Sequence, residues 1–397
     1  MAQRLKILEL CEYSAGICGV FTRVLAESQL LAENHDVFIF SSNIEKGTKN
    51  IAPIEQTLGK VHIKRFPVKR KIAEGSGGAL FWDFEQAALD LNPDIIITHN
   101  YRHPHNNKAL KIAGKIRAKC FLVTHAPFVE PHLRSWKGKL GVYVYDTFLS
   151  KLNAFDKVIA ITHWELPYLK KLKVNPEKIV YIPNGIPDIF FKEKIKPFKW
   201  REIIYFGRIS PIKDLETLLK AYQQVKEKNK AVYLKIIGPE EFEYGLQLKK
   251  LSEKLGLDTQ FIPPVFDLQE KIKILQKADI FILPSKREAM PQALIELMAL
   301  GKIVITSNTE GGKDVVENGK NGLIFQIKNA HELGEKILYT LDKRNSGKIR
   351  KMQQSARKTA EQFAWSKVIK KLEALLSSVS ENVPKRAQNR KIYTQNS

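Results

Sequence analysis

The stretch IIYFGRISPIKDLETLLKAYQQVK, residues 203–226, decides the fold class of this chain. Its first four residues are all apolar, which predicts a strand buried on both faces, as in a parallel sheet covered by helices. A loop containing Gly207 follows, and from Leu215 the apolar residues recur with the spacing of a helix. A buried strand, a loop and a helix in this order are the repeating unit of a doubly wound α/β fold.

The same unit recurs along the chain. The other apolar runs are Ile7–Cys11, Val37–Phe40, Ile95–Ile97, Phe121–Val123, Val158–Ile161, Val232–Ile237, Ile280–Leu283 and Ile303–Ile305. Helical patterns fall between them, for example at Thr22–Glu33 and Leu215–Lys226. About ten strands are too many for one Rossmann unit, so we predict two doubly wound Rossmann-like domains.

A break between these domains is indicated where turn residues cluster, at Ile182–Pro187. The strandless stretch Phe190–Trp200 follows it. We therefore expect a first domain over residues 1–185 and a second over residues 186–365. The stretch Lys69–Gly78 is basic and then glycine-rich, which is typical of a mobile loop.

The net charge of +23 comes from 65 Lys and Arg residues against 42 Asp and Glu residues. Such a charge attracts polyanions, whether nucleic acid, anionic lipid headgroups or phosphorylated substrates. Much of the excess lies near the end of the chain, since residues 342–397 carry fourteen basic and four acidic residues. The tail, residues 381–397, is polar and basic, and we expect it to be disordered. Elsewhere the cations are scattered and no known nucleic-acid module is present, so no specific nucleic-acid partner is expected.

The sequence also limits the compartment. No run approaches the roughly eighteen apolar residues of a transmembrane helix. Met1–Arg4 leads directly into an apolar strand pattern without the layout of a signal peptide. Cys11, Cys18 and Cys120 have neither metal spacing nor an even-numbered disulfide framework. We therefore predict a cytoplasmic protein.

In open α/β sheets ligands bind at the carboxyl ends of the strands, so we expect the ligand-binding residues in the loops that follow the apolar runs. The loop after Ile203–Phe206 holds Arg208 and Lys213. A planar guanidinium and a compact ammonium suit the two phosphates of a diphosphate. Taken alone, the pair is better explained as two of the 65 cations on a surface loop.

The loop after Ile280–Leu283 combines an anion site with carboxylates. Pro291 suits the first helical position, which predicts a helix from about Met290 whose free N–H groups attract an anion. Glu288 precedes this helix, and Glu296 lies about two turns into it. Carboxylates accept hydrogen bonds from sugar and ribose hydroxyls, so these residues indicate a ligand that carries both phosphate and hydroxyl groups. After Ile303–Ile305, the pair Gly311–Gly312 is a weaker candidate for a second phosphate loop.

The first half of the chain gives a less specific signal. A glycine loop that ends at Gly19 precedes a helical pattern, but it is not G-x-G-x-x-G and predicts no dinucleotide site. His99 and His125 each end a predicted strand, which favours a polar substrate site. The run His103–His105 has no third metal ligand nearby and is predicted to be a loop.

Together these loops resemble those of glycosyltransferase family 4. The resemblance is carried by Arg208 with Lys213 as R-x4-K, then Glu288 with Glu296 as E-x7-E, each pair after a strand. It extends over about residues 5–380. Further matches are Gly19–Val20, Asn34–Val37, Asn184–Ile186, Gly319–Leu323 and Phe363–Trp365.

The resemblance implies a GT-B fold, with two Rossmann-like domains that face each other across a cleft. It also implies a retaining, metal-independent transfer of a hexose-type sugar from a nucleotide-diphosphate donor, a UDP- or GDP-sugar, with no further cofactor. In similar enzymes the residues matching Arg208 and Lys213 neutralise the leaving diphosphate, and the one matching Glu288 contacts the sugar hydroxyls. The residue matching Glu296 contacts the ribose, and the histidine matching His125 lies over the reacting sugar.

Other residues are assigned to the donor or the acceptor on the same basis. The remaining donor contacts expected are Gly19, Val265, Ala289, Met290 and Pro291. His99 is expected on the acceptor side, and residues 366–380 are expected to form a helix that crosses back to the first domain. The sequence departs from the family pattern at Cys18, Ala289, Ile303 and Pro187. None of these departures removes Arg208 or Lys213, the two charged residues expected to bind the diphosphate.

Two alternatives stay open. A GT-B nucleotide-sugar epimerase would bind a similar donor, but the E-x7-E pair disfavours it. A basic polyanion- or membrane-binding protein without activity would use the net charge instead.

Aromatic and basic residues mix within residues 128–148, and this mixture suits a membrane interface as well as a loop packed beside a cleft. We therefore hypothesise a peripheral enzyme on the inner face of the membrane with a lipid-linked, glycan or other polar acceptor. The donor base, the sugar, the acceptor, the linkage and the oligomeric state stay open.

Overall fold

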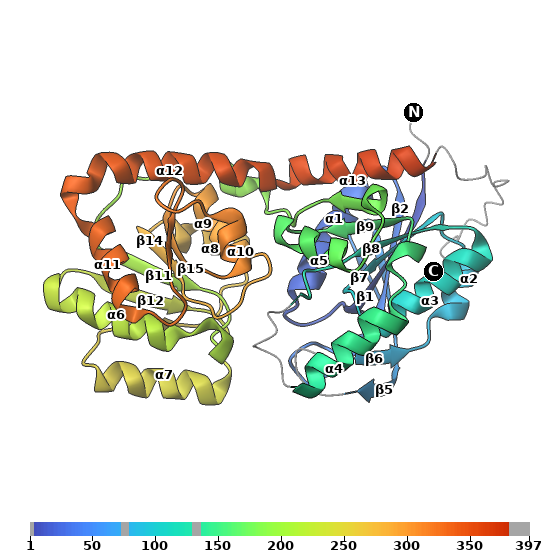
Figure 1. The fold of residues 1–397 in the computed structure, drawn as a ribbon, viewed down its shortest axis with the longest axis horizontal. Helices are drawn as coiled ribbons and strands as arrows, with labels where there is room; N and C mark the ends of the chain where they lie inside the picture. The colour runs from blue at the N-terminus through green and yellow to red at the C-terminus, as the bar shows by residue number, and fades with distance from the viewer. Residues whose placement is uncertain (1–3, 73–78, 129–135, 381–397) are drawn as a thin grey trace, which may run out of the picture. The chain divides into compact units, whose positions relative to one another are not determined.

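The computed structural model describes residues 4–72, 79–128 and 136–380 (Figure 1). The chain divides into two compact units. The first contains residues 1–122, 151–157 and 370–397, and the second contains residues 123–150 and 158–369. The disorder predicted for residues 381–397 concerns residues outside the described part. The predicted domain boundaries at 185 and 365 stay a prediction.

The first unit contributes six strands, in the order β8-β7-β1-β2-β4-β3, to a largely parallel eight-stranded sheet whose other two strands are β9 (Lys157–Ala160) and β10 (Ile179–Tyr181). Among these strands only β3 pairs antiparallel. Its helix α1 packs on β1 and β2, and α3 packs on β7. The elements are β1 (Lys6–Tyr13), α1 (Gly19–Leu31), β2 (Asp36–Ser42), β3 (Glu55–Leu58), β4 (Val61–Phe66), β5 (Val68–Ile72), β6 (Ala79–Trp82), α2 (Glu85–Leu91), β7 (Ile95–His99), α3 (Pro104–Ile116), β8 (Lys119–Val123) and the short η3 (Leu152–Ala154).

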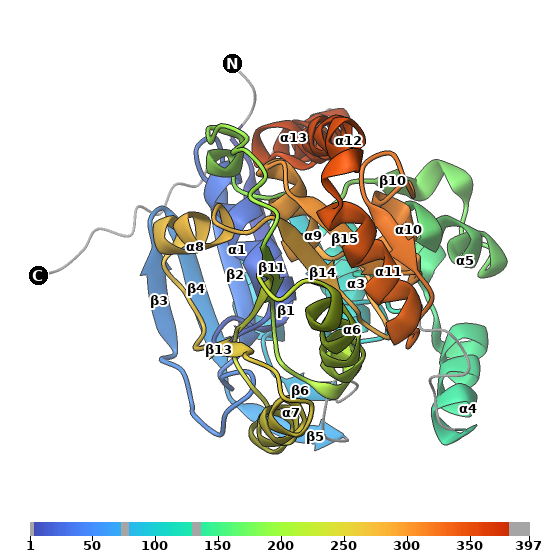
Figure 2. The same cartoon turned by 90° about the vertical axis from the view of Figure 1, so that its left-hand side faces the viewer.

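The second unit is built on a six-stranded parallel sheet with the order β13-β12-β11-β14-β15-β16. Figure 2 shows this unit, in which α6 packs against α11 and α9 against α12. Its strands and longer helices are α4 (Trp136–Val144), β9 (Lys157–Ala160), α5 (Leu166–Lys171), β10 (Ile179–Tyr181), β11 (Glu202–Phe206), α6 (Leu215–Lys228), β12 (Tyr233–Ile237), α7 (Phe242–Lys254), β13 (Gln260–Ile262), α8 (Leu268–Leu275), β14 (Ile280–Leu283), α9 (Gln292–Ala299), β15 (Ile303–Ser307), α10 (Glu310–Val315), β16 (Leu323–Phe325), α11 (Ala330–Leu341) and α12 (Ser346–Ala360).

Short helical turns and one shared helix complete the structure. The turns of the second unit are η2 (Tyr145–Leu149), η4 (His163–Glu165), η5 (Pro176–Lys178), η6 (Asp188–Phe191), η7 (Pro211–Lys213), η8 (Lys343–Asn345) and η9 (Glu361–Phe363). The last helix, α13 (Trp365–Ser380), belongs to the second unit up to Ile369 and to the first unit from Lys370.

The apolar runs of the sequence form the strands predicted from them, and the doubly wound α/β class is confirmed. All four residues of β14 and the apolar start of β15 are buried, as expected for a sheet covered on both faces. In α6 the residues Leu215, Leu218, Tyr222 and Val225 are buried at helical spacing, which fixes this helix against the sheet.

Two local predictions are wrong. Residues 69–72 are not a loop but lie in β5, which pairs antiparallel with β6. The basic side chains are tolerated there because they point into solvent; residues 73–78 lie outside the described part. His103–His105 is likewise not a loop, since α3 begins at Pro104, whose fixed φ suits a first helical position. None of the described helices is both long enough and apolar enough to cross a bilayer.

Candidate active site

The loops after β11 and β14 bring together two residues that the sequence assigned to one ligand. Lys213 Nζ lies 2.6 Å from Glu288 Oε1, and the Ser285 hydroxyl donates to the same oxygen at 2.6 Å. The Lys213 and Glu288 side chains are 19% and 10% exposed, so the pair is partly desolvated but still reachable from solvent. In this ion pair the lysine offers a positive charge for a phosphate group, and the glutamate offers hydrogen-bond acceptors for hydroxyl groups.

The backbone around this pair is tied together by further contacts. The Lys286 amide donates to the Ile212 carbonyl at 2.8 Å, so the β14 loop is bonded to the β11 loop. Gly311 lies behind Glu288, and a Cβ at this position would stand 2.7 Å from the Glu288 carbonyl oxygen. The Gly311–Gly312 pair therefore allows close packing behind the loop, and α10 begins there at Glu310.

Arg208 lies in the same β11 loop but outside the lysine–glutamate pair. Its side chain is 56% exposed, and Nη1 lies 3.9 Å from Glu241 Oε1. The Tyr205 hydroxyl donates to the Arg208 carbonyl at 2.7 Å, which fixes the backbone while the guanidinium stays in solvent. Because an exposed ion pair of this length contributes little, the guanidinium can turn toward an anionic ligand at small cost.

The β14 loop leads into α9 later than predicted. The helix begins at Gln292, and Pro291 is its N-cap with φ −79° and ψ 92°, not the first helical residue. An extended ψ at the proline delays the start, so the predicted start at about Met290 is wrong by two residues. Met290 is buried, its sulfur accepts from the Asn184 amide at 3.2 Å, and the Ala289 carbonyl accepts from Trp164 Nε1 at 3.0 Å.

Glu296 lies in the second turn of α9 and is paired with a lysine that was not predicted from the sequence. Lys271 Nζ of α8 donates to Glu296 Oε1 at 2.7 Å and lies 2.6 Å from Oε2. The ammonium also lies 4.9 Å from the Phe206 ring centroid at the end of β11. Glu296 thus holds a second charged pair close to the carboxyl ends of the strands.

Val265 lies in the short connection between β13 and α8 and is half-buried. Its neighbour Phe266 is 76% exposed, one of the most exposed aromatic side chains among the described residues. This connection leaves the same edge of the sheet as the β11 and β14 loops, since β13 runs parallel to β12.

In the first unit, Gly19 is the exposed first residue of α1. A Cβ at Gly19 would meet nothing within 4 Å, whereas one at Gly16 would stand 2.4 Å from the Lys46 carbonyl oxygen. Gly16 also has φ +77°, so Gly16, and not Gly19, is the glycine that this loop requires. The expected ligand contact of Gly19 stays a prediction.

His125 follows β8 in a strained turn of the second unit. His125 has φ 57° and Ala126 has φ 49°, and two consecutive left-handed residues that are not glycine are unusual. The buried carboxylate of Glu165 accepts from the Ala126 amide at 2.9 Å and from the Thr124 hydroxyl. Sequence reasoning missed Glu165, although Thr162–Glu165 has the spacing of a capping box, and that box is present in the structure.

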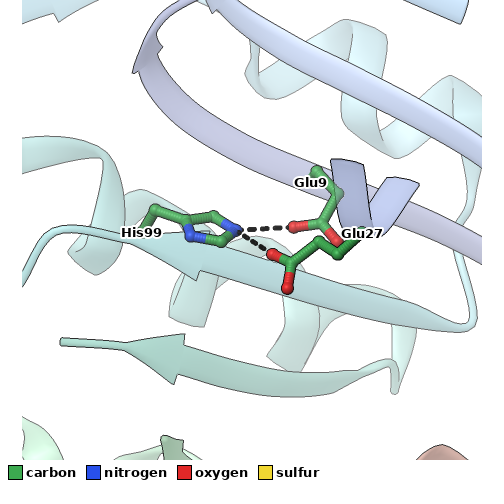
Figure 3. A group of neighbouring side chains, drawn as sticks. All are labelled: Glu9, Glu27 and His99. Carbon is green, nitrogen blue, oxygen red and sulfur yellow. Dashed lines mark hydrogen bonds and ion pairs between the residues drawn. The ribbon is translucent and has the colours of Figure 1, made fainter. Parts of the chain in front are cut away.

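His99, expected on the acceptor side, is completely buried at the end of β7 (Figure 3). Its Nε2 lies 2.7 Å from Glu9 Oε2 and 3.5 Å from Glu27 Oε1, and Arg23 Nε donates to Glu27 Oε2 at 3.1 Å. In this structure the imidazole is therefore not accessible to an acceptor. A direct contact would require it to move, and its acceptor-side role stays a prediction.

Glu9, Glu27 and His99 are also a group that could hold a metal ion, since their ligand atoms lie within 4.8 Å of one another. Burial raises the pKa of Glu9 to about 8 and lowers that of His99 to about 4. A neutral Glu9 then donates to a neutral His99. Burial raises the pKa of Glu27 and the neighbouring Arg23 guanidinium opposes this shift, so Glu27 is the partner of the Arg23 charge. A divalent cation that displaced the Glu9 proton would leave a net positive charge in the core, so charge balance favours a structural network over a metal centre.

Comparison with known proteins places the chain in a family. The model of the glycosyl transferases group 1 matches residues 187–362, and the model of glycosyltransferase family 4 matches residues 17–188. An uncharacterized glycosyltransferase of Methanocaldococcus jannaschii is 27% identical over 372 residues, which are 88% of this chain and 91% of the relative.

A second relative has a named activity. The N,N'-diacetylbacillosaminyl-diphospho-undecaprenol alpha-1,3-N-acetylgalactosaminyltransferase of Campylobacter jejuni is 33% identical over 198 residues, which are 49% of this chain and 50% of the relative. Among solved structures, Anabaena HepE in complex with UDP-glucose superposes with a TM-score of 0.71 at 16% identity, covering 94% of this chain and 100% of HepE. This likeness shows the fold, GT-B with two Rossmann-like domains. The chain belongs to glycosyltransferase family 4 and is a glycosyltransferase.

Proposed function

We propose that the protein transfers a hexose-type sugar with retention from a nucleotide-diphosphate donor, a UDP- or GDP-sugar, to a lipid-linked acceptor. The observation that carries this proposal is the Lys213–Glu288 contact of 2.6 Å at the carboxyl ends of β11 and β14, with Arg208 in the same loop. HepE, which has the same fold, was solved with UDP-glucose, which supports a nucleotide sugar as the donor.

The charged residues divide the donor between them in this proposal. Arg208 and Lys213 bind the diphosphate, and the two positive charges stabilise it as it leaves. When Lys213 turns to the phosphate, Glu288 is released to accept hydrogen bonds from the sugar hydroxyls. Glu296 accepts from the ribose, and the connection that contains Val265 and Phe266 lies beside the base.

The reaction proceeds by same-face attack. The bond between the anomeric carbon and the diphosphate oxygen breaks while a bond to the acceptor oxygen forms on the same face. The acceptor proton passes to the leaving phosphate oxygen, so no protein base is needed. Arg208 and Lys213 supply the positive charge that a metal provides in other transferases, and we therefore propose a metal-independent reaction.

The acceptor is proposed to be lipid-linked because of the C. jejuni relative and an exposed apolar segment. The name of that relative contains a diphospho-undecaprenol acceptor. In α4 and η2, residues Trp136, Tyr143 and Phe148 are 70%, 63% and 74% exposed, and Leu140, Val144 and Leu149 are also exposed. Such a concentration of exposed apolar side chains needs a covering partner.

A membrane surface suits this segment by composition and by charge. Trp136, Leu140, Tyr143 and Val144 recur at i, i+4, i+7 and i+8, which places them on one face of α4. Tryptophan and tyrosine favour the bilayer interface, and residues 136–151 carry three lysines and one aspartate. With the net charge of +23, these features support peripheral binding to an anionic leaflet.

The donor is tested by thermal unfolding with a panel of nucleotide sugars. A donor at 100 times its dissociation constant should stabilise the protein by about 2.7 kcal/mol. We expect a UDP- or GDP-hexose to raise Tm and the Lys213→Ala variant to lose this shift. If every nucleotide sugar leaves Tm unchanged, the donor assignment is wrong.

The membrane is tested by sedimentation with liposomes that contain phosphatidylglycerol. The wild type should sediment at low salt, and the double variant Trp136→Ser/Tyr143→Ser should not. Phe242→Ser is the matched control, because Phe242 is 73% exposed on α7 outside this segment. The absence of wild-type binding at low salt, or equal losses in both variants, contradicts the membrane proposal.

A further inference from the structure

Glu165, at the end of η4, collects an unusual number of hydrogen bonds on one buried carboxylate. Its Oε1 accepts from the Thr124 hydroxyl and from the Ala126 amide at 2.9 Å. Its Oε2 accepts from the amides of Ile161 and Thr162 at 2.8 Å and 3.0 Å and from the Thr162 hydroxyl at 3.1 Å. The side chain thus joins the segment after β8 to the segment after β9.

The two oxygens serve different parts of the structure. The Oε2 side bonds residues 161 and 162, and its bond from the Thr162 amide is one half of the capping box of η4. The Oε1 side bonds residues 124 and 126, which flank His125. His125 and Ala126 both have positive φ, a conformation that residues other than glycine rarely adopt. Contacts with other parts of the chain must therefore hold the backbone in this conformation.

We propose that Glu165 is a positioning residue of the transferase, whose Oε1 holds the His125 turn in the conformation that catalysis uses. The proposal rests on the transfer reaction proposed above and on the place over the reacting sugar that the family resemblance implies for His125. Glu165 itself is completely buried, so a substrate in solvent cannot reach its carboxylate in this structure. It acts through the backbone on either side of His125.

A carboxylate suits this role better than any uncharged side chain. An ionised glutamate accepts on both oxygens and donates on neither, whereas glutamine accepts on one atom and donates on the other. Burial raises the pKa of Glu165, and the hydrogen bonds it accepts act in the opposite direction by favouring the ionised form. Five donors around two oxygens leave no acceptor for a carboxyl proton, apart from the rotatable threonine hydroxyls.

Glu165→Gln should therefore disturb one side selectively. The amide oxygen should turn toward Ile161 and Thr162, where two backbone N–H groups need an acceptor. The amide NH2 would then face the Ala126 N–H, and donor would oppose donor. The capping box would be kept, and the His125 turn would be released.

The experiment compares Glu165→Gln with a control of the same chemistry. Glu202→Gln changes another buried glutamate of the second unit, which is bonded to the Tyr233 hydroxyl and to Lys235 Nζ at the start of β11. In Glu165→Gln we expect kcat to fall by about 100-fold with the donor KM changed less than about twofold, because small displacements of a positioned group cost this much. Glu202→Gln should lose Tm to a similar extent without this loss of kcat.

A second readout is independent of activity. In protein labelled at histidine, the His125 imidazole resonances, assigned with His125→Gln, should shift in Glu165→Gln and not in Glu202→Gln. If the wild type transfers no sugar from any donor, the proposed function fails, and these resonances still test the positioning. Unchanged His125 resonances, or a loss of kcat no larger than in the control, would overturn the role of Glu165.

Discussion

The Lys213–Glu288 pair and the Glu9–Arg23–Glu27–His99 cluster use similar residue types in opposite surroundings. The pair lies on loops at the carboxyl ends of β11 and β14, with side chains 19% and 10% exposed. The cluster lies between β1, α1 and β7, with side chains 0–1% exposed. The pair can exchange its internal contact for a ligand, whereas the cluster cannot open without exposing the core.

This difference separates activity from stability. Changes in the loop pair should remove transfer and leave the fold intact. Changes in the buried cluster should act first on the free energy of unfolding. Five substitutions test this separation, from the largest expected effect to the smallest.

Lys213→Ala should lower kcat by about 1,000-fold, since removal of one group that stabilises developing charge costs roughly that much. Glu288→Gln should lower kcat by about 100-fold, since it removes an acceptor that positions the reacting sugar. Nucleotide release from the donor is the measurement. Lys235→Ala is the matched control, because Lys235 pairs with Glu202 at 2.8 Å with side chains 19% and 4% exposed, within β12 and β11. Turnover that survives in either loop variant would falsify the assignment of the pair.

Glu27→Ala should lower the free energy of unfolding by about 3 kcal/mol, because it leaves the buried Arg23 guanidinium without its ion-pair partner. Urea unfolding measures this loss, and kcat below the transition should be close to that of the wild type. A stable variant that has lost activity would show that the cluster serves the reaction directly.

Glu296→Gln should raise the donor KM about tenfold with little change in kcat. A ribose contact is made equally in the ground state and in the transition state, so its loss weakens binding alone. The comparison with Glu288→Gln is informative because both residues pair with a lysine in this structure. A loss of kcat in Glu296→Gln would place this carboxylate at the reacting sugar instead.

Glu9→Gln should change the pH dependence of stability. Burial raises the pKa of Glu9 from 4.5 to about 8, so between these values the folded state binds a proton that the unfolded state has lost. This contribution to stability is complete below pH 4.5 and is lost as the pH rises to about 8. The lowered pKa of His99, about 4, acts oppositely, but only up to its ordinary value of 6.5.

From about pH 6.5 to 8, the wild type should therefore lose stability relative to Glu9→Gln by about 1.4 kcal/mol per pH unit, the value for one proton. Chemical unfolding at pH 6.5, 7.2 and 8.0 measures the difference. Parallel curves for the two proteins would mean that Glu9 is ionised throughout, contrary to the neutral cluster described here.

The doubly wound fold follows from the sequence because continuous apolar runs such as Ile280–Leu283 can be satisfied only by burial on both faces. The strands β3, β4, β6, β10, β13 and β16 were not predicted. β3 and β10 contain only exposed or half-buried residues, so their periodicity is weak. β5 was not predicted because its run of lysine and arginine has no apolar periodicity, and the pairing with β6 cannot be seen in the sequence.

The candidate site was predicted in part for a similar reason. Arg208, Lys213 and Glu288 lie in the loops after the apolar runs at 203–206 and 280–283, and Glu296 lies in the helix after the second loop, so strand ends and loop chemistry together located them. Lys271 lies on a helix and Glu165 in a helical turn. The contacts that Lys271 makes with Glu296, and Glu165 with Thr124 and Ala126, join residues that are 25, 41 and 39 positions apart. His99 is buried against Glu9. An acidic residue inside an apolar strand indicates a buried partner, and this was the one feature of the sequence that could have predicted the burial of His99.

The most direct test of the central claim is a crystal structure of this chain with a nucleotide sugar that raises its Tm. We predict that Lys213 Nζ leaves Glu288 and lies about 2.8 Å from a diphosphate oxygen, the usual length of a charge-assisted hydrogen bond. Glu288 should then accept from a hexose hydroxyl. A donor bound elsewhere, or one bound at these strand ends with the Lys213–Glu288 pair intact, would contradict the account.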